Sequence, residues 1–394
     1  MLDRRHFFSR PNRLYKMSSR VFYLVLTVFL LLLVGCTGSI GIYPPRLLIV
    51  GLIENSTPQL ALIEDTFLTS NAIPNRIRFI ENSRRTIAEP AITFDVVERN
   101  GDRSELLVLS RSSDDPYQSY FDFFNLSGID PSSPSAFTAT RTRIDLSALV
   151  GVAGFCPTEA GISRDGQSAI VFSDRTFCSG DDFRAIYFLD LETETVVDTI
   201  DSEPIFGAGI YIDQDLGKAY FLLDEISTSL YCVDLDGKNR ALISDGLGLS
   251  DPIDLGQAGQ TFVVLQDDSF QTIDFSTAPP TLNSPVVTPS NSSLLIESPR
   301  NLVPEILFLT GSNLLAYHDE STAPGETFAS TALNGIIEPE LGFAYLILET
   351  GLQIFDLISF DSSLNSIIKN YSIHEVTIPG PISWTKGLLL GAMR

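Results

Sequence analysis

The sequence predicts an all-β fold assembled from a repeated unit of short strands. Three observations predict it. A short apolar pattern that ends in a polar residue, usually Asp, returns at intervals near 40 residues. Two well-preserved copies each read as four strands separated by turn residues. Beyond the N-terminal segment, no stretch keeps the 3.6-residue apolar period of an amphipathic helix.

The repeated pattern is clearest in the second half of the chain. Its final polar residues, from Asp190 onward, lie 44, 40, 44 and 38 residues apart, and the two earlier gaps are 61 and 65. A repeat near 40 residues built from short strands is the period of a β-propeller blade. Seven copies predict a single propeller, most simply of seven four-stranded blades, with six or eight left open. The copies are Ile186–Leu191, Leu230–Leu235, Phe270–Phe275 and Leu352–Leu357, and, more weakly, Leu60–Glu64, Tyr120–Leu126 and Leu314–His318.

Two consecutive units carry the four predicted strands in full. Asp165-Gly166 in the first unit and Asp236-Gly237 in the second favour tight turns between strands, because Gly adopts the positive φ that such turns need. The strands predicted for the first unit are Ala160–Ile162, Ser168–Phe172, Ala185–Leu191 and Thr195–Ile200. Those predicted for the second unit are Ala208–Ile212, Ala219–Leu223, Ser229–Leu235 and Ala241–Ser244.

The segment Leu230–Arg240, with the sequence LYCVDLDGKNR, resembles the YWTD-type and TolB-like propeller repeats. The resemblance is strong over about one blade and extends to the other units only in pattern. It implies the propeller fold and no particular activity, since a fold hosts many functions.

The two ends of the domain complement each other. Strands are predicted at Leu47–Leu52 and Leu60–Glu64 near one end, and within Pro381–Leu390 at the other. We expect the N- and C-terminal strands to pair in one blade, because this closes the ring and leaves no exposed edge strand. The predicted propeller domain is 46–394.

The N-terminal segment has the layout of a secretory signal. Val21–Val34 is apolar or aromatic except for Thr27, follows six basic residues, and is shorter than the roughly 20 residues that span a bilayer. It ends in Leu33-Val34-Gly35-Cys36, which resembles the lipobox of bacterial lipoproteins. The resemblance implies a signal peptide over 1–35, acylation of Cys36 with palmitate or a similar chain, and a short tether over 36–45.

The lipobox implies that Cys36 holds the chain to the lipid bilayer on the periplasmic or extracellular side. Thr37, rather than Asp, follows Cys36 and favours the outer membrane if the organism has one. A non-cleaved anchor extending through Ile42 is the alternative. Met17 is a second candidate start, and Arg4-Arg5 leaves twin-arginine export open beside ordinary secretion.

Composition excludes several classes of function. The net charge is −23 and becomes −28 without residues 1–36, so nucleic acid and anionic headgroups are unfavourable partners. Only His318 and His374 follow the leader, in different units, which argues against a histidine metal cluster or a histidine-based triad. The absence of CxxC spacing argues against structural zinc. We expect no metal and no cofactor.

The remaining cysteines are explained by folding. Cys156 stands just before the first strand of its unit, and Cys178 stands between the second and third. In a propeller those two connections emerge on the same face, so an oxidising compartment favours a disulfide between them over two free thiols. Cys232 lies in an alternating strand and is expected to be a buried small hydrophobe.

The Asp residues that end the repeated pattern are expected to hold turns or blade contacts rather than a ring of ligands. They are Asp190, Asp234, Asp274 and Asp356. Asp234-Leu-Asp236-Gly237 and Ser179–Asp182 each offer fewer oxygens than the six to eight that calcium takes.

Two functional hypotheses follow. The first is an envelope-anchored, non-catalytic propeller that binds or scaffolds a protein or glycan partner. The alternative is a propeller hydrolase or lactonase that uses acidic residues at the central channel, with or without calcium. A purely structural envelope component is a third reading. The sequence contains no motif that decides among them.

Overall fold

The computed structural model divides into two units, Met1–Tyr43 and Pro44–Arg394, and the described residues all lie in the second. The predicted signal peptide, Cys36 and tether therefore lie outside the described residues. These residues are 46–54, 56–65, 77–99, 102–126, 138–139, 143–180, 183–201, 210–213, 217–224, 228–245, 247, 249, 252–258, 261–274, 281–289, 291–296, 306–311, 313–317, 328–330, 332, 334–338, 343–348, 352–356, 360–361, 366–367 and 388–390.

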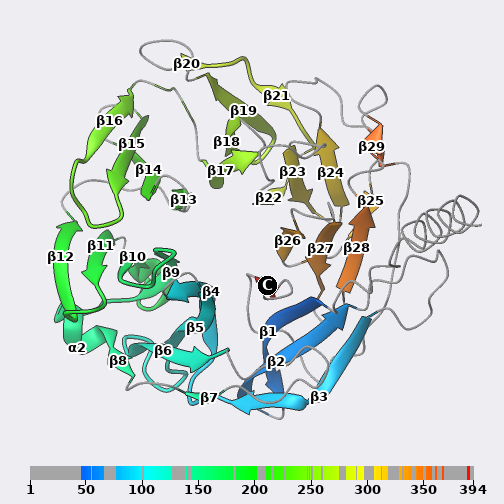
Figure 1. The fold of residues 1–394 in the computed structure, drawn as a ribbon. Helices are drawn as coiled ribbons and strands as arrows, with labels where there is room; N and C mark the ends of the chain where they lie inside the picture. Colours follow the sequence, from blue (N-terminus) through cyan, green and yellow to red (C-terminus); the bar gives the residue numbers. More distant parts are fainter. Residues whose placement is uncertain are drawn as a thin grey trace, which may run out of the picture. The chain divides into compact units, whose positions relative to one another are not determined.

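The second unit is an all-β propeller, as the sequence predicts. Antiparallel sheets, four of which have four described strands, follow one another around a ring (Figure 1). Helix in the described residues is limited to α2 (Leu146–Val150) and the 3₁₀ turn η1 (Arg175–Phe177). Neither is long and apolar enough to cross a bilayer.

The first four sheets run from the innermost strand outward. Their strands are β31 (Leu388–Leu390), β1 (Arg46–Glu54), β2 (Thr57–Asp65) and β3 (Ile77–Thr86); β4 (Ala91–Arg99), β5 (Asp102–Arg111), β6 (Ser119–Asn125) and β7 (Thr138–Ala139), with β8 (Ile144–Asp145) also on β6; β9 (Pro157–Ile162), β10 (Ser168–Asp174), β11 (Arg184–Asp190) and β12 (Thr195–Ile200); and β13 (Tyr211–Asp213), β14 (Lys218–Asp224), β15 (Thr228–Asp234) and β16 (Ala241–Ser244).

The later sheets follow the same order. Their strands are β17 (Asp254–Ala258), β18 (Thr261–Leu265), β19 (Ser269–Asp274) and β20 (Thr281–Leu282), with β21 (Val286–Val287) also on β19; β22 (Ser292–Ile296), β23 (Ile306–Thr310), β24 (Asn313–Tyr317) and β25 (Phe328–Ala329); β26 (Asn334–Glu338), β27 (Phe343–Ile347) and β28 (Leu352–Asp356); and the pair β29 (Phe360–Asp361) and β30 (Ser366–Ile367).

The innermost strands lie next to one another around the ring. In turn these are β31, β4, β9, β13, β17, β22 and β26, and β26 lies beside β31 again. The described residues thus form seven sheets with an innermost strand. The last of these has three described strands, and β29–β30 form a separate pair, so the number of blades stays a prediction.

The repeated sequence pattern corresponds to the third strand of each sheet. Its copies fall on or next to β2, β6, β11, β15, β19, β24 and β28. The eight strands predicted for the two complete units are β9 to β16, within a few residues at each end. The sequence missed α2, although Asp145 and Gly151 cap it: the Asp145 carboxylate accepts from the Ala148 N–H, and Gly151 has a φ of 65°.

The chain ends pair as predicted. β31 lies antiparallel to β1, with Leu47 opposite Leu390 and Ile49 opposite Leu388. Ile49 is fully buried. The C-terminal strand therefore supplies the innermost position of a sheet whose other three strands come from the N-terminal end.

The two Asp-Gly turns are also confirmed. Gly166 has a φ of 69° and its N–H donates to the Ser163 carbonyl at 2.8 Å. Gly237 has a φ of 79° and donates to the Asp234 carbonyl at 2.8 Å. A Cβ at Gly237 would lie 3.1 Å from Phe188, so this position needs glycine for space as well as for conformation.

The core consists of apolar layers between neighbouring sheets. Phe121 of β6 belongs to the same cluster as Val171 of β10, and Phe188 of β11 packs in a cluster with Phe221 of β14. Each burial of such a side chain contributes about 1.5–3 kcal/mol, which makes these interfaces the main source of stability. Cys232 lies buried in the layer between the β13–β16 and β17–β20 sheets, as expected.

Innermost strands approach one another where one of them carries glycine. A Cβ on Gly161 of β9 would lie 1.7 Å from Cδ1 of Ile212 on β13, so the isoleucine occupies the space a side chain would take. Gly335 of β26 receives Ile296 of β22 in the same way. A polar contact also joins two innermost strands: the Asp254 carboxylate of β17 accepts from the Leu295 N–H of β22 at 2.8 Å.

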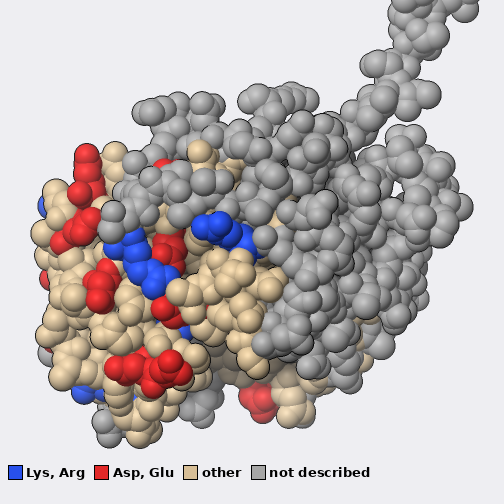
Figure 2. Space-filling model, turned by 90° about the horizontal axis from the view of Figure 1, so that it is seen from below, with Lys and Arg blue, Asp and Glu red and all other residues tan. Residues whose placement is uncertain are grey.

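Acidic and basic side chains are interspersed on one side of the molecule (Figure 2). The described surface there shows groups of both signs rather than a continuous acidic field. The net charge of −23 belongs to the whole sequence. On the described part of this side, the acidic residues do not form one continuous patch.

Replacing Gly161 with Ala should destabilise the propeller by about 1–3 kcal/mol, because the new methyl group overpacks against Ile212. Adding Ile212→Val, which removes Cδ1, should restore part of the loss. Urea unfolding of both variants measures this.

Gly180→Ala is the matched control. Gly180 has a φ of 80° and nothing within 4 Å of a built Cβ, so its substitution costs only backbone strain of about 1 kcal/mol. No rescue of Gly161→Ala by Ile212→Val, or the same rescue of Gly180→Ala, would contradict the packing argument.

Candidate functional site

Two Asp residues of the repeat, Asp190 and Asp234, make local structural contacts at the ends of third strands. The Asp190 carboxylate accepts hydrogen bonds from the N–H groups of Glu192 and Thr193, both at 2.9 Å. The bond from the Thr193 N–H is the main cause of the lowered pKa of Asp190. The Asp234 carboxylate accepts from Lys218 Nζ at 2.7 Å, which is the main cause of its lowered pKa. The prediction that these two residues are structural is confirmed.

Asp274 ends β19 and Asp356 ends β28, the corresponding strand positions in two other sheets. Among the residues that the structure describes, no group of three or more His, Cys, Asp or Glu side chains is placed to hold a metal ion. Asp254, on an innermost strand, uses its carboxylate on the Leu255 and Leu295 N–H groups. His318 and His374 lie outside the described residues.

The predicted disulfide between Cys156 and Cys178 is present. It joins the link before β9 to the loop after β10, two connections that emerge on one face of the propeller, as the sequence argument required. Cys156 is fully buried, and its N–H donates to Ser173 Oγ at 2.9 Å. Cys178 is partly exposed.

Three segments meet around this disulfide and form what we call the disulfide platform: loop 112–118 between β5 and β6, link 151–156 between α2 and β9, and loop 175–180 between β10 and β11. The disulfide connects the second and third segments. Cys178 Sγ lies 3.3 Å from the Pro116 carbonyl oxygen, which brings in the first.

Hydrogen bonds hold the platform segments in place. Arg175 Nε donates to the Gly154 carbonyl at 2.9 Å, and Nη2 of the same residue donates to the Ala153 carbonyl. The buried Asp174 carboxylate accepts from the Thr176 N–H at 2.9 Å and from Arg184 Nε at 2.9 Å. The start of loop 175–180 is therefore tied to the β9–β12 sheet and to the link before it.

The platform exposes apolar side chains. Phe177 is 70% exposed and Val152 is 41% exposed. Phe177 stands next to Cys178 in a loop whose backbone closes on itself, since the N–H groups of Cys178 and Ser179 both donate to the Arg175 carbonyl. An aromatic side chain is thus held outward on a constrained loop.

Arg111, at the end of β5, lies against the disulfide. Its Nη1 is 3.4 Å from Cys156 Sγ, 3.6 Å from Cys178 Sγ and 3.4 Å from the Pro157 carbonyl oxygen. Burial lowers the pKa of Arg111. In the part of the chain that the structure describes, no carboxylate contacts this guanidinium. No motif in the sequence marks Arg111, because its contact with the disulfide forms only when the β4–β7 and β9–β12 sheets pack together.

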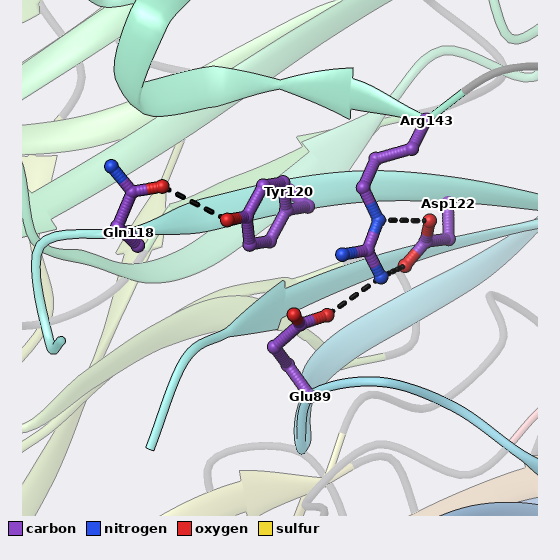
Figure 3. Close-up of polar contacts among 5 residues, drawn as sticks. All are labelled: Glu89, Gln118, Tyr120, Asp122 and Arg143. Atoms are coloured by element: carbon purple, nitrogen blue, oxygen red, sulfur yellow. Dashed lines mark hydrogen bonds and ion pairs between the residues drawn. The ribbon is translucent and has the colours of Figure 1, made fainter. Parts of the chain in front are cut away.

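A second polar group, the Arg143 cluster, consists of Glu89, Gln118, Tyr120, Asp122 and Arg143 (Figure 3). Arg143 contacts the Asp122 carboxylate through Nε and Nη2, both at 2.7 Å, and Glu89 Oε2 through Nη2 at 2.6 Å. Its guanidinium carbon lies 4.2 Å from the centre of the Tyr120 ring. The two carboxylates, Asp122 first, raise the pKa of Arg143.

Most polar groups of the Arg143 cluster are paired within it, although buried Glu89 Oε2 has the ion pair with Arg143 and no hydrogen bond. Tyr120 donates its hydroxyl proton to Gln118 Oε1 at 2.9 Å, and burial, then Asp145 and Glu89, raises its pKa. Glu89 belongs to the connection between β3 and β4, whereas Asp122 lies on β6. The cluster therefore joins a connection between sheets to the outer part of the next sheet, and we assign it to stability rather than to ligand binding.

Comparison with known proteins supports the fold. No family model matches the sequence, and no curated protein matches it. A solved propeller from Bacteroides uniformis, assigned as a 6-phosphogluconolactonase, is similar with a TM-score of 0.58 and 9% identity, over 88% of this chain and 99% of that chain. A counterpart from Bacteroides fragilis has a TM-score of 0.58 and 10% identity, over 88% and 98%.

A chain of the nidogen–laminin complex has a TM-score of 0.42 and 11% identity, over 72% of this chain and 93% of that chain. The likeness to the two Bacteroides structures, at 9% and 10% identity, shows the propeller fold alone, and no argument rests on the nidogen–laminin chain.

Replacing Arg143 with Met should destabilise the protein by about 2 kcal/mol, because it removes charge-assisted hydrogen bonds and leaves Glu89 and Asp122 facing each other. Urea unfolding measures the loss. Lys238→Met is the control, since its ion pair with Asp236 is solvent-exposed and should add nothing measurable. An Arg143→Met variant as stable as the control would contradict a structural role for the cluster.

Proposed function

We propose that this chain is an envelope lipoprotein, acylated at Cys36, whose propeller binds or scaffolds a protein or glycan partner through the disulfide platform without catalysing a reaction. The observation that carries the binding half is Phe177, 70% exposed on a loop fixed by the Cys156–Cys178 disulfide. The proposed partner is contacted on the face of the propeller where the platform lies.

The platform has two physical properties of a binding surface. Aromatic side chains dominate the energetics of interfaces because they bury a large apolar area with few rotatable bonds. A loop already fixed in one conformation loses little entropy when a partner binds, and this favours affinity. An exposed Phe ring suits the apolar face of a sugar as well as an apolar pocket of a protein.

The proposed lipid anchor at Cys36 is inferred from the sequence. Lipid attached at Cys36 would precede the first described strand by ten residues, since β1 begins at Arg46. Ten residues span at most about 35 Å, so such a tether would hold the propeller close to the membrane surface. Two or three acyl chains hold a protein stably at a membrane, whereas a single chain holds it only marginally.

Replacing Phe177 with Ser should weaken partner binding about 30-fold, the equivalent of the roughly 2 kcal/mol lost when an anchoring aromatic is truncated. The full chain, immobilised from detergent extracts, is used to recover partners from envelope extracts of the source cells. Val287→Ser is the matched control, because Val287 is 75% exposed on the outer strand β21, away from the platform.

Loss of the same partner with both substitutions, or with neither, would contradict the assignment of the platform. Hydrolysis of lactones or glycosides by the purified chain, together with a calcium-dependent rise in melting temperature, would favour the alternative hydrolase or lactonase instead.

Replacing Cys36 with Ala should abolish incorporation of radioactive palmitate and release the chain from the membrane fraction. Labelling of cells that express each form, followed by fractionation, tests this. A wild-type chain that takes up no label would overturn the anchor, and it would leave the binding experiment unaffected.

A further inference from the structure

We propose that the Cys156–Cys178 disulfide is a site of thiol–disulfide exchange, attacked at Cys178 by an external dithiol, with Arg111 stabilising the Cys156 thiolate that leaves. The disulfide would thereby act as a reducible cross-link between two segments of the platform. This goes beyond its expected role as a structural cross-link.

The two sulfurs differ in access. Cys156 is 0% exposed, whereas Cys178 is partly exposed on loop 175–180. Cys178 is therefore the side of the disulfide from which we expect an incoming thiolate to approach. Attack there makes Cys156 the leaving group, and the rate of exchange rises as the leaving thiolate is stabilised.

Arg111 is placed to supply that stabilisation. Its Nη1 lies 3.4 Å from Cys156 Sγ and 3.6 Å from Cys178 Sγ. A disulfide is neutral and gives a guanidinium little in return for its burial. A thiolate at the same position would form a charge-assisted contact with it. Arg111 therefore favours the reduced state over the oxidised one.

The environment of Arg111 strengthens this argument. The described residues place no carboxylate against it, although the chain carries 49 Asp and Glu residues against 26 Lys and Arg. Its other contact is a neutral one, the Pro157 carbonyl oxygen. Among the described residues, no anionic group therefore pairs with Arg111 while the disulfide is intact, and release of Cys156 as a thiolate would supply one.

The exchange balances without any cofactor. One thiolate of the dithiol forms a bond to Cys178 Sγ, the S–S bond breaks, and its electron pair goes to Cys156 Sγ. The second thiol of the dithiol, once deprotonated, attacks the dithiol's first sulfur, which is bonded to Cys178 Sγ. The mixed disulfide breaks and Cys178 is released as a thiolate. The dithiol is oxidised by two electrons to a disulfide, and the two cysteines are reduced.

Reduction would remove the covalent link between link 151–156 and loop 175–180, which carries Phe177. Loop 175–180 would keep the Arg175 contacts with Gly154 and Ala153 but become more mobile. If the proposed function holds, on which this last step rests, binding through Phe177 should weaken in the reduced state. The exchange reaction itself does not depend on a partner.

The test is a redox titration of the full oxidised chain at pH 7 in mixtures of reduced and oxidised dithiothreitol. Free thiols at 156 and 178 are alkylated and quantified by peptide mass analysis, so that Cys36 and Cys232 do not interfere. Arg111→Met should require about tenfold more reductant for half reduction, equivalent to about 30 mV, and Arg111→Lys should stay near wild type.

Arg175→Met is the matched control. It loosens the same platform without removing a charge from the sulfurs, so it should leave the midpoint unchanged or make reduction easier. A merely structural Arg111 predicts that same direction for Arg111→Met, whereas the proposal predicts the opposite. An Arg111→Met disulfide reduced as easily as wild type, or a wild-type disulfide reduced only in denaturant, would overturn the proposal.

A second measurement locates the attacked sulfur. In Cys156→Ser, the remaining Cys178 should react quickly with an aromatic disulfide reagent, and in Cys178→Ser the buried Cys156 should react slowly. The reverse order would contradict the assignment of Cys178. Partner recovery with Phe177→Ser is measured separately, so failure of the binding proposal and failure of the exchange proposal give different results.

Discussion

The pairing of β1 with β31 is the contact on which the rest of the propeller depends. It joins Leu47 to Leu390 and Ile49 to Leu388, so residues near the two ends of the domain lie side by side. Without β31, the β1–β3 sheet would lack its innermost strand and expose a strand edge. The contact also closes a very long loop, and its entropy cost is repaid only when the intervening sheets are in place. Closure is thus a cooperative property of the ring.

Close packing at the innermost strands is the second requirement, and it explains individual residues. Gly161 makes room for Ile212, and Gly335 makes room for Ile296, each from the neighbouring sheet. Asp254 meets the backbone of Leu295 across the same kind of boundary. A carboxylate at an innermost strand is here engaged in joining sheets. A polar residue near the axis of a propeller is therefore not by itself a sign of chemistry.

Local patterns in the sequence predicted much of this architecture. The repeat found the third strand of each sheet, because that strand ends in a turn held by a polar side chain such as Asp190. The disulfide followed from the position of Cys156 and Cys178 relative to strands. Arg111 and the Arg143 cluster could not be predicted, since their partners lie 21 to 67 residues away and meet only after the sheets pack. Outer strands such as β20 and β21 were missed because two-residue strands leave no periodicity.

The contrast between the charged groups bears on what the disulfide platform is for. Arg143 is paired with two carboxylates, and Lys218 is paired with Asp234. Both arrangements compensate the charge and add hydrogen bonds, as stability requires of partly buried cations. Arg111 instead faces two neutral sulfurs and a carbonyl oxygen. Selection for stability alone would favour a carboxylate or an apolar residue there. A cation that gains an anionic partner when the disulfide opens fits a position adjusted for reactivity, near Phe177, which is 70% exposed.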